Sequence, residues 1–236
     1  MSLASLTRAS ILVAIVTAPG WLMANGDFCN STTFREAFLA GQDAIAFDYR
    51  DVSSKLIALG NDALPCLQSI AESGGEVYGI DGCIEGPHGC ELWAVRAIGQ
   101  IGTREAMQFL TDYLESDRAS RPLVAAINHL RIQKVTNNRA ALLKLIKHRD
   151  PEVQVAALVA LGAIGDPSDF EAMLDTALSL PDDYLYKGSQ AFELLGDPRA
   201  IEPLARRAKL ILDPIQRDAV EGRVKRLRSE SDSQSE

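Results

Sequence analysis

The fold is decided by one stretch, DPEVQVAALVALGAIGDP at residues 150–167. Asp150 can cap the N-terminus of a helix, and Pro151 suits the first helical position, where its missing N–H costs nothing. Gly165 suits the left-handed conformation that ends a helix, and Asp166-Pro167 caps and begins the next one. The stretch therefore predicts one complete, short helix. Its apolar residues are spaced to form one broad face: Val155, Ala157, Leu158, Leu161 and Ile164.

The signal that ends this helix recurs along the chain at a nearly fixed step. Successive breaks at Gly102, Gln133, Gly165 and Gly196 are 31, 32 and 31 residues apart, with Gln133 standing where a glycine is expected. An earlier break at Gly60 lies 42 residues before Gly102, which indicates an insertion of about eleven residues. Five helix pairs of constant period predict an all-α fold, a right-handed α-solenoid. A second helix is expected after each break, at Ala63–Glu72, Arg104–Glu115, Asn138–Lys147, Asp169–Leu180 and Arg199–Ile211.

These units resemble the short HEAT-type, armadillo-like repeat of about 30 residues, the subtype also found in phycobilin lyases and deoxyhypusine hydroxylases. The resemblance is strongest over Asp150–Leu178 and Tyr184–Ile211. It is good over Glu91–Ser116 and weaker over Asp51–Ser73 and Arg121–Ile146. It implies an interaction surface and no particular activity, because a fold does not carry a reaction with it.

No catalytic residue, metal site or cofactor is predicted. The metal motif of the hydroxylases needs His-Glu pairs, and none of the three histidines, His88, His129 and His148, stands in one. We carry over no lyase residues, because the resemblance to the lyases extends only to repeat form. An enzyme is the less favoured interpretation.

The first 24 residues predict a signal peptide. Arg8 precedes the apolar run Ala9–Ala18, Pro19-Gly20 interrupts it, and cleavage is expected after Ala24. A retained membrane anchor is the alternative, but the apolar stretch of about 16 residues is shorter than the ~20 that a spanning helix needs. We therefore expect an exported protein, periplasmic or secreted.

The rest of the chain divides into four segments. Residues 25–43 are expected to cap the open end of the array, with a capping box at Thr33 and Glu36, and Asp43 is expected to cap the next helix. The repeat array occupies 44–212 and contains a glycine- and cysteine-rich insertion at 73–90. A C-terminal capping helix is expected at 213–228, with Ile215 among its inward residues. The tail 229–236 is rich in serine and acids and is expected to be disordered.

Four cysteines in an exported chain suggest two disulfides. Three pairings are open, and we prefer Cys83–Cys90, which closes a short glycine-rich loop and leaves Cys29–Cys66. The alternative is a zinc site made from Asp81, Cys83, Glu85, His88 and Cys90, but Cys-x6-Cys with one histidine is not a common zinc pattern.

The favoured function is a non-catalytic scaffold or adaptor that binds a protein or peptide on a concave face built from the second helices. A metal-dependent or lyase-like accessory enzyme that uses the 73–90 loop is the alternative. The candidate groove residues lie one turn apart on the second helices: Gln108, Asp112, Lys144, Lys147, Glu171, Asp175, Glu202 and Arg206. The candidates in the loop are Tyr78, Asp81, Glu85 and His88.

Charge limits the range of partners. The chain carries −8 with a pI near 5.0, so nucleic-acid binding is not expected. Residues 199–228 carry a net charge of +5, so membrane contact is expected only through this basic end. A monomer is expected.

Overall fold

The computed structural model describes residues 28–43, 54–73, 89–116 and 118–233. Every regular element in these ranges is a helix, which confirms the predicted all-α class. None of the described helices is long and apolar enough to cross a membrane. The α-helices are α2 (Thr32–Asp43), α3 (Ser54–Leu59), α4 (Leu64–Ser73), α5 (Gly89–Ile101), α6 (Arg104–Tyr113), α7 (Ser120–Ile132), α8 (Arg139–Leu145), α9 (Pro151–Ile164), α10 (Phe170–Ser179), α11 (Asp182–Gly188), α12 (Gln190–Leu195), α13 (Ile201–Ala208) and α14 (Pro214–Ser233).

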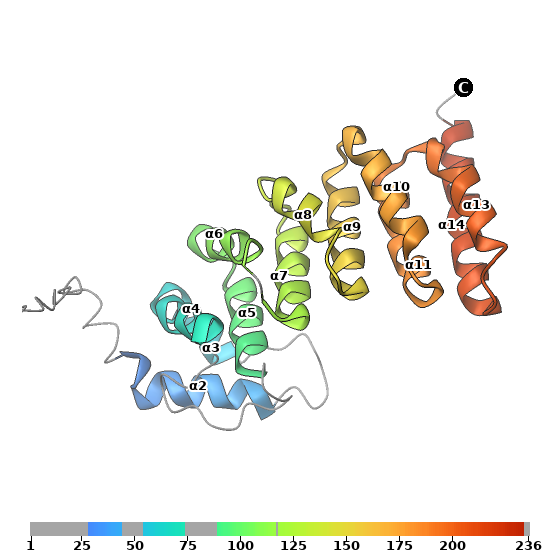
Figure 1. The fold of residues 1–236 in the computed structure, drawn as a ribbon. Coiled ribbons are helices and arrows are strands. Elements are labelled where there is room, and N and C mark those ends of the chain that lie inside the picture. Colours follow the sequence, from blue (N-terminus) through green and yellow to red (C-terminus); the bar gives the residue numbers. More distant parts are fainter. Residues whose placement is uncertain (1–27, 44–53, 74–88, 117, 234–236) are drawn as a thin grey trace, which may run out of the picture.

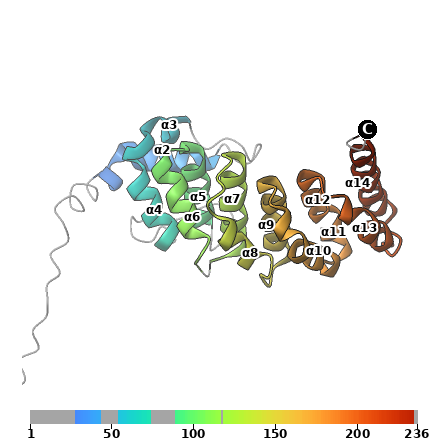
Figure 2. The ribbon, with the colours of Figure 1, turned by 90° about the horizontal axis from the view of Figure 1, so that it is seen from above.

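The helix pairs follow one another in a row, in the order of the sequence, and α2 packs on α3 at its N-terminal end (Figures 1 and 2). The first helices of successive pairs are α3, α5, α7, α9 and the split helix α11–α12, and the second helices are α4, α6, α8, α10 and α13. Contacts run between neighbours in this order: α5 packs on α7, α7 on α9, α9 on α11 and α12, and α12 on α14. Each unit therefore covers the apolar face of the next.

The predicted start and stop signals operate as expected. Asp150 Oδ1 accepts a hydrogen bond from the Glu152 N–H at 2.9 Å, and Gly165 ends α9 with φ of 76°. Asp166 and Asp197 cap the short 3-10 turns Pro167–Asp169 and Pro198–Ala200 in the same way. The second helices start and end within a few residues of their predicted limits.

One repeat break is displaced from its predicted place. Gln133 has φ of −79°, and the left-handed residue is its neighbour Lys134, with φ of 55°. With Lys134 at the break, the intervals become 32, 31 and 31 residues. Sequence could not identify this position, because lysine carries no preference for the left-handed conformation.

The N-terminal segment is tied to the first described pair by the predicted Cys29–Cys66 disulfide. Cys90 is also disulfide-bonded, and Cys83, its expected partner, lies outside the described residues. The cap of α2 differs from the expected one: Ser31 Oγ accepts from the Phe34 N–H at 3.2 Å, and the helix begins at Thr32. α2 ends at Asp43, and the helix that Asp43 was expected to cap would begin in 44–53, which lie outside the described residues.

The C-terminal helix corrects two predictions. α14 continues through Ser233, so residues 229–233 are helical where disorder was expected, and 234–236 lie outside the described residues. Ion pairs of Arg226 and Arg228 with acids on α12 and α13 hold this end, and the Ser229 hydroxyl donates to the Arg226 carbonyl. Ile215, expected to point inward, is 80% exposed.

Candidate binding groove

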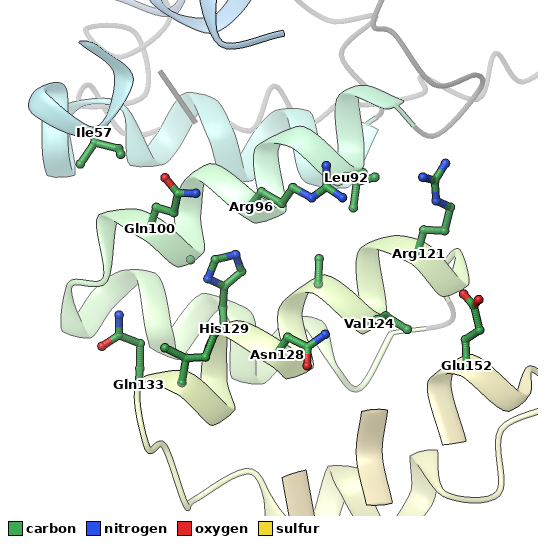
Figure 3. A pocket seen from close by; sticks show the side chains of 13 residues that line it. Ile57, Leu92, Arg96, Gln100, Arg121, Val124, Asn128, His129, Gln133 and Glu152 are labelled. Carbon is green, nitrogen blue, oxygen red and sulfur yellow. The ribbon is translucent and has the colours of Figure 1, made fainter. Parts of the chain in front are cut away.

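A cavity of about 640 Å³ lies on the first-helix side of the array, between α5 and α7 (Figure 3). α5 supplies Leu92, Arg96, Gly99 and Gln100, and α7 supplies most of the opposite wall. Ile57 of α3 and Glu152 of α9 lie at its margins. The α7 residues are Arg121, Val124, Ala125, Asn128, His129 and Ile132, followed by Gln133.

Gly99 and His129 determine the shape of the cavity floor. A Cβ at position 99 would lie 2.1 Å from His129 Cγ, so the imidazole occupies the space that any larger residue would fill. Burial lowers the pKa of His129, and the nearby positive charge of Arg96 lowers it further. The ring is therefore neutral at pH 7, with one nitrogen that can donate a hydrogen bond and one that can accept.

The lining combines hydrogen-bonding and apolar side chains. Gln100, Asn128 and Gln133 present amides, which can donate and accept, and Arg96 and Arg121 present guanidinium groups. Ile132 stands at the rim with 62% of its surface exposed. A concave site with apolar walls and a few convergent polar groups is typical of ligand sites.

A smaller cavity of about 250 Å³ continues this site along the row. It shares Val124, Asn128 and Glu152 with the first cavity and adds four residues of α9 and α11: Val155, Ala156, Tyr184 and Lys187. The Lys187 ammonium lies 5.7 Å from the centroids of both the Tyr184 and Tyr186 rings. We call the two joined cavities the first-helix groove. It crosses the first helices of successive units, from Ile57 to Lys187.

The residues predicted to bind a partner lie on the other side of each pair. Gln108 and Asp112 are brought together on α6, where the Gln108 amide donates to Asp112 Oδ1 at 2.9 Å, and both line a separate cavity of about 440 Å³. Lys144, Glu171 and Glu202 form ion pairs with Glu115, Arg199 and Arg228. Arg206 Nε donates to the Glu202 carbonyl at 3.4 Å. Lys147 and Asp175 are exposed, and neither lines a described cavity.

The predicted loop candidates Tyr78, Asp81, Glu85 and His88 lie outside the described residues. Most of the alternative metal site therefore lies there too. Within the ranges that the structure describes, no three His, Cys, Asp or Glu side chains are grouped closely enough to hold a metal ion.

Sequence reasoning missed the first-helix groove altogether. The available signal was the presence of Arg96, Gln100 and Asn128 among the apolar residues of the predicted first helices. A buried polar group without a partner is costly. A polar side chain on a helix face that packs against neighbours therefore indicates a space there in which the group can stay in contact with water or a ligand.

The pair α5–α6, of which α5 lines the groove, is also the part of the chain that matches a known family. Residues 92–116 match the model of the PBS lyase HEAT-like repeat. No curated protein matches the chain. Inside this pair the buried Tyr113 hydroxyl donates to Glu91, and burial, followed by Glu91, raises the pKa of Tyr113 well above its ordinary value. The resemblance predicted from the sequence is thus confirmed for α5 and α6, which form a HEAT-like repeat of the PBS lyase type.

Proposed function

We propose that the protein is a non-catalytic scaffold that holds a protein or peptide partner in the first-helix groove. The observation that carries the proposal is the groove itself, whose apolar walls and amides extend over several units. Amides such as Gln100 and Asn128 suit a peptide, because its backbone offers alternating donors and acceptors. HEAT-like repeats generally mediate protein interactions, which supports the same class of function.

The partner is proposed on the first helices instead of the concave second-helix face expected from the sequence. The second-helix candidates are spread over separate units, and several of them are engaged in ion pairs between units. Gln100, Asn128 and Gln133, by contrast, all line one cavity. The second-helix face is kept as the competing site in the experiment below.

We further propose that the units form a right-handed superhelix and that the protein is a monomer. Packing between successive units supports an elongated solenoid. Small-angle scattering should give a single elongated particle with the mass of one chain, and a compact or dimeric particle would contradict this.

Export to the periplasm or the exterior is also proposed. The Cys29–Cys66 disulfide and the bonded state of Cys90 support an oxidising compartment. Mass spectrometry of the mature protein should give a chain that begins at Asn25, with all four cysteines resistant to alkylation before reduction. Free thiols in protein taken directly from cells would contradict this.

Site-specific photo-crosslinking tests the location of the partner. A benzophenone side chain at Val124, which lines both cavities of the groove, is expected to give a discrete cross-linked partner in the native host. The same side chain at Gln108 on the second-helix face is the matched control and is expected to give none. Cross-links from position 108 alone would move the site to the second helices, and none from either position would overturn the scaffold proposal.

A further inference from the structure

A cavity of about 460 Å³ lies away from the first-helix groove, where α7 turns into α8 against α9. It shares no residue with the groove. Arg131 and Lys134 supply two cations, and none of the described residues that line it is acidic. Apolar residues of the lining include Leu142, Ala160 and Ile164. Its volume lies within the range of small-molecule sites.

Lys134 holds a conformation that its side chain does not favour. Its φ of 55° is the left-handed value that glycine adopts at the corresponding breaks Gly102, Gly165 and Gly196. An L-residue with a side chain is strained there, and strained non-glycine residues gather at functional sites. In this unit a lysine with a strained backbone therefore stands at the break and lines the cavity.

Two polar atoms beside this cavity are left unsatisfied. Asn138 is only 3% exposed, and its Oδ1 has no hydrogen-bond partner among the described residues. The buried Nε of Arg131 also has no partner among them. Buried polar groups are almost always hydrogen-bonded to protein, ordered water or a ligand, so a polar ligand in this cavity is one way to satisfy both residues.

We propose that this cavity binds a carboxylate carried on a short apolar group. The cations of Arg131 and Lys134 hold the carboxylate, which a guanidinium can bind through two hydrogen bonds. The hydrocarbon part packs against Leu142, Ala160 and Ile164. A donor next to the carboxylate satisfies Asn138. The last residue of a peptide with an apolar side chain has all three features, and a simple short-chain acid has the first two.

Binding of two defined probes to the full chain tests the proposal. The first is a fluorescein-labelled hexapeptide that ends in leucine with a free carboxylate, followed by fluorescence anisotropy. The second is hexanoate, followed by isothermal titration calorimetry. Replacing the terminal carboxylate of the peptide by an amide should weaken its binding at least tenfold. Tighter binding of the peptide than of hexanoate assigns the site to a peptide C-terminus, and the reverse order assigns it to a free acid.

Lys134→Gly separates binding from folding. The substitution removes the cation and also relieves the strained φ, so the melting temperature should stay the same or rise while binding falls at least fivefold. Lys225→Ala, at an exposed lysine of α14 outside the cavity, is the matched control and should leave binding unchanged. Three results would overturn the proposal: no binding of either probe, equal binding of the acid and amide peptides, or wild-type affinity in Lys134→Gly.

Discussion

Gly162 gives the sharpest test of the packing between repeat units. It lies in α9 against α12, and a Cβ at this position would lie 2.2 Å from the Ala191 carbonyl oxygen and 2.8 Å from Ala191 Cα. These neighbours are backbone atoms, so no side chain can rotate away to make room. In Gly162→Ala, α9 and α12 must therefore move apart.

The magnitude follows from two opposing effects. Alanine is favoured over glycine inside a helix by about 1 kcal/mol. Forcing an extra carbon into a packed contact costs about 1–3 kcal/mol, and a clash with backbone belongs at or above the upper end of that range. The net loss in the free energy of unfolding is about 2 kcal/mol. For a chain of this size that corresponds to a fall in melting temperature of roughly 4–8 °C.

Circular dichroism at 222 nm during thermal and urea unfolding measures this change. Gly222→Ala is the matched control, because the nearest atom to its new Cβ is Arg226 Nη1 at 3.7 Å, an ordinary contact. That variant should gain up to about 1 kcal/mol from helix propensity alone. If Gly162→Ala is as stable as the wild type, or gains as much unfolding free energy as Gly222→Ala, then α9 and α12 do not approach each other as closely as described.

Three further predictions concern the disulfide, the groove and acid stability. Reducing Cys29–Cys66, which closes 37 residues, should lower the free energy of unfolding by about 4 kcal/mol, measured from urea midpoints of Cys29→Ser/Cys66→Ser against the wild type. Because the folded state lowers the pKa of His129, its contribution to the free energy of unfolding should be complete above about pH 6.5 and should fall below that pH. His129→Gln should flatten this part of the plot of unfolding free energy against pH. An unchanged slope in the variant would contradict a buried, neutral His129 ring. Hydrogen bonds from Arg199 lower the pKa of Asp197, so the contribution of Asp197 to the free energy of unfolding should be present above about pH 4 and be lost as the pH falls further. In urea titrations at acid pH, Asp197→Asn should therefore lose less unfolding free energy than the wild type.

The parts of the fold that the sequence predicted are those decided by local chemistry. Asp150 caps α9 because its carboxylate reaches an N–H two residues away, and Gly165 ends it because of its own backbone freedom. Either effect needs only neighbours in the chain. The disulfide Cys29–Cys66 was predicted by a different route, since pairing Cys83 with Cys90 left no other choice.

The features that were missed depend on contacts between units. Arg228, just before the last turn of α14, pairs with Glu202 on α13, a contact that no local pattern in 229–236 indicates. The imidazole of His129 on α7 fills the space left by Gly99 on α5 at the groove, and both residues are unremarkable within their own helices. Local propensity cannot reveal a site whose walls meet only after the units stack.

The distribution of charge along the second helices bears on where a partner binds. Lys144 pairs with Glu115, and Glu171 with Arg199, so each pair joins residues of two successive units. Such exposed pairs contribute little stability, about 0–1 kcal/mol each, but they neutralise charges that a partner on that face would have to displace. The amides of the groove carry no charge, so a peptide backbone that hydrogen-bonds to them displaces no ion pair of theirs. The neutral amides between the first helices, flanked by Arg96, Arg121, Glu152 and Lys187, are therefore the binding surface that we propose.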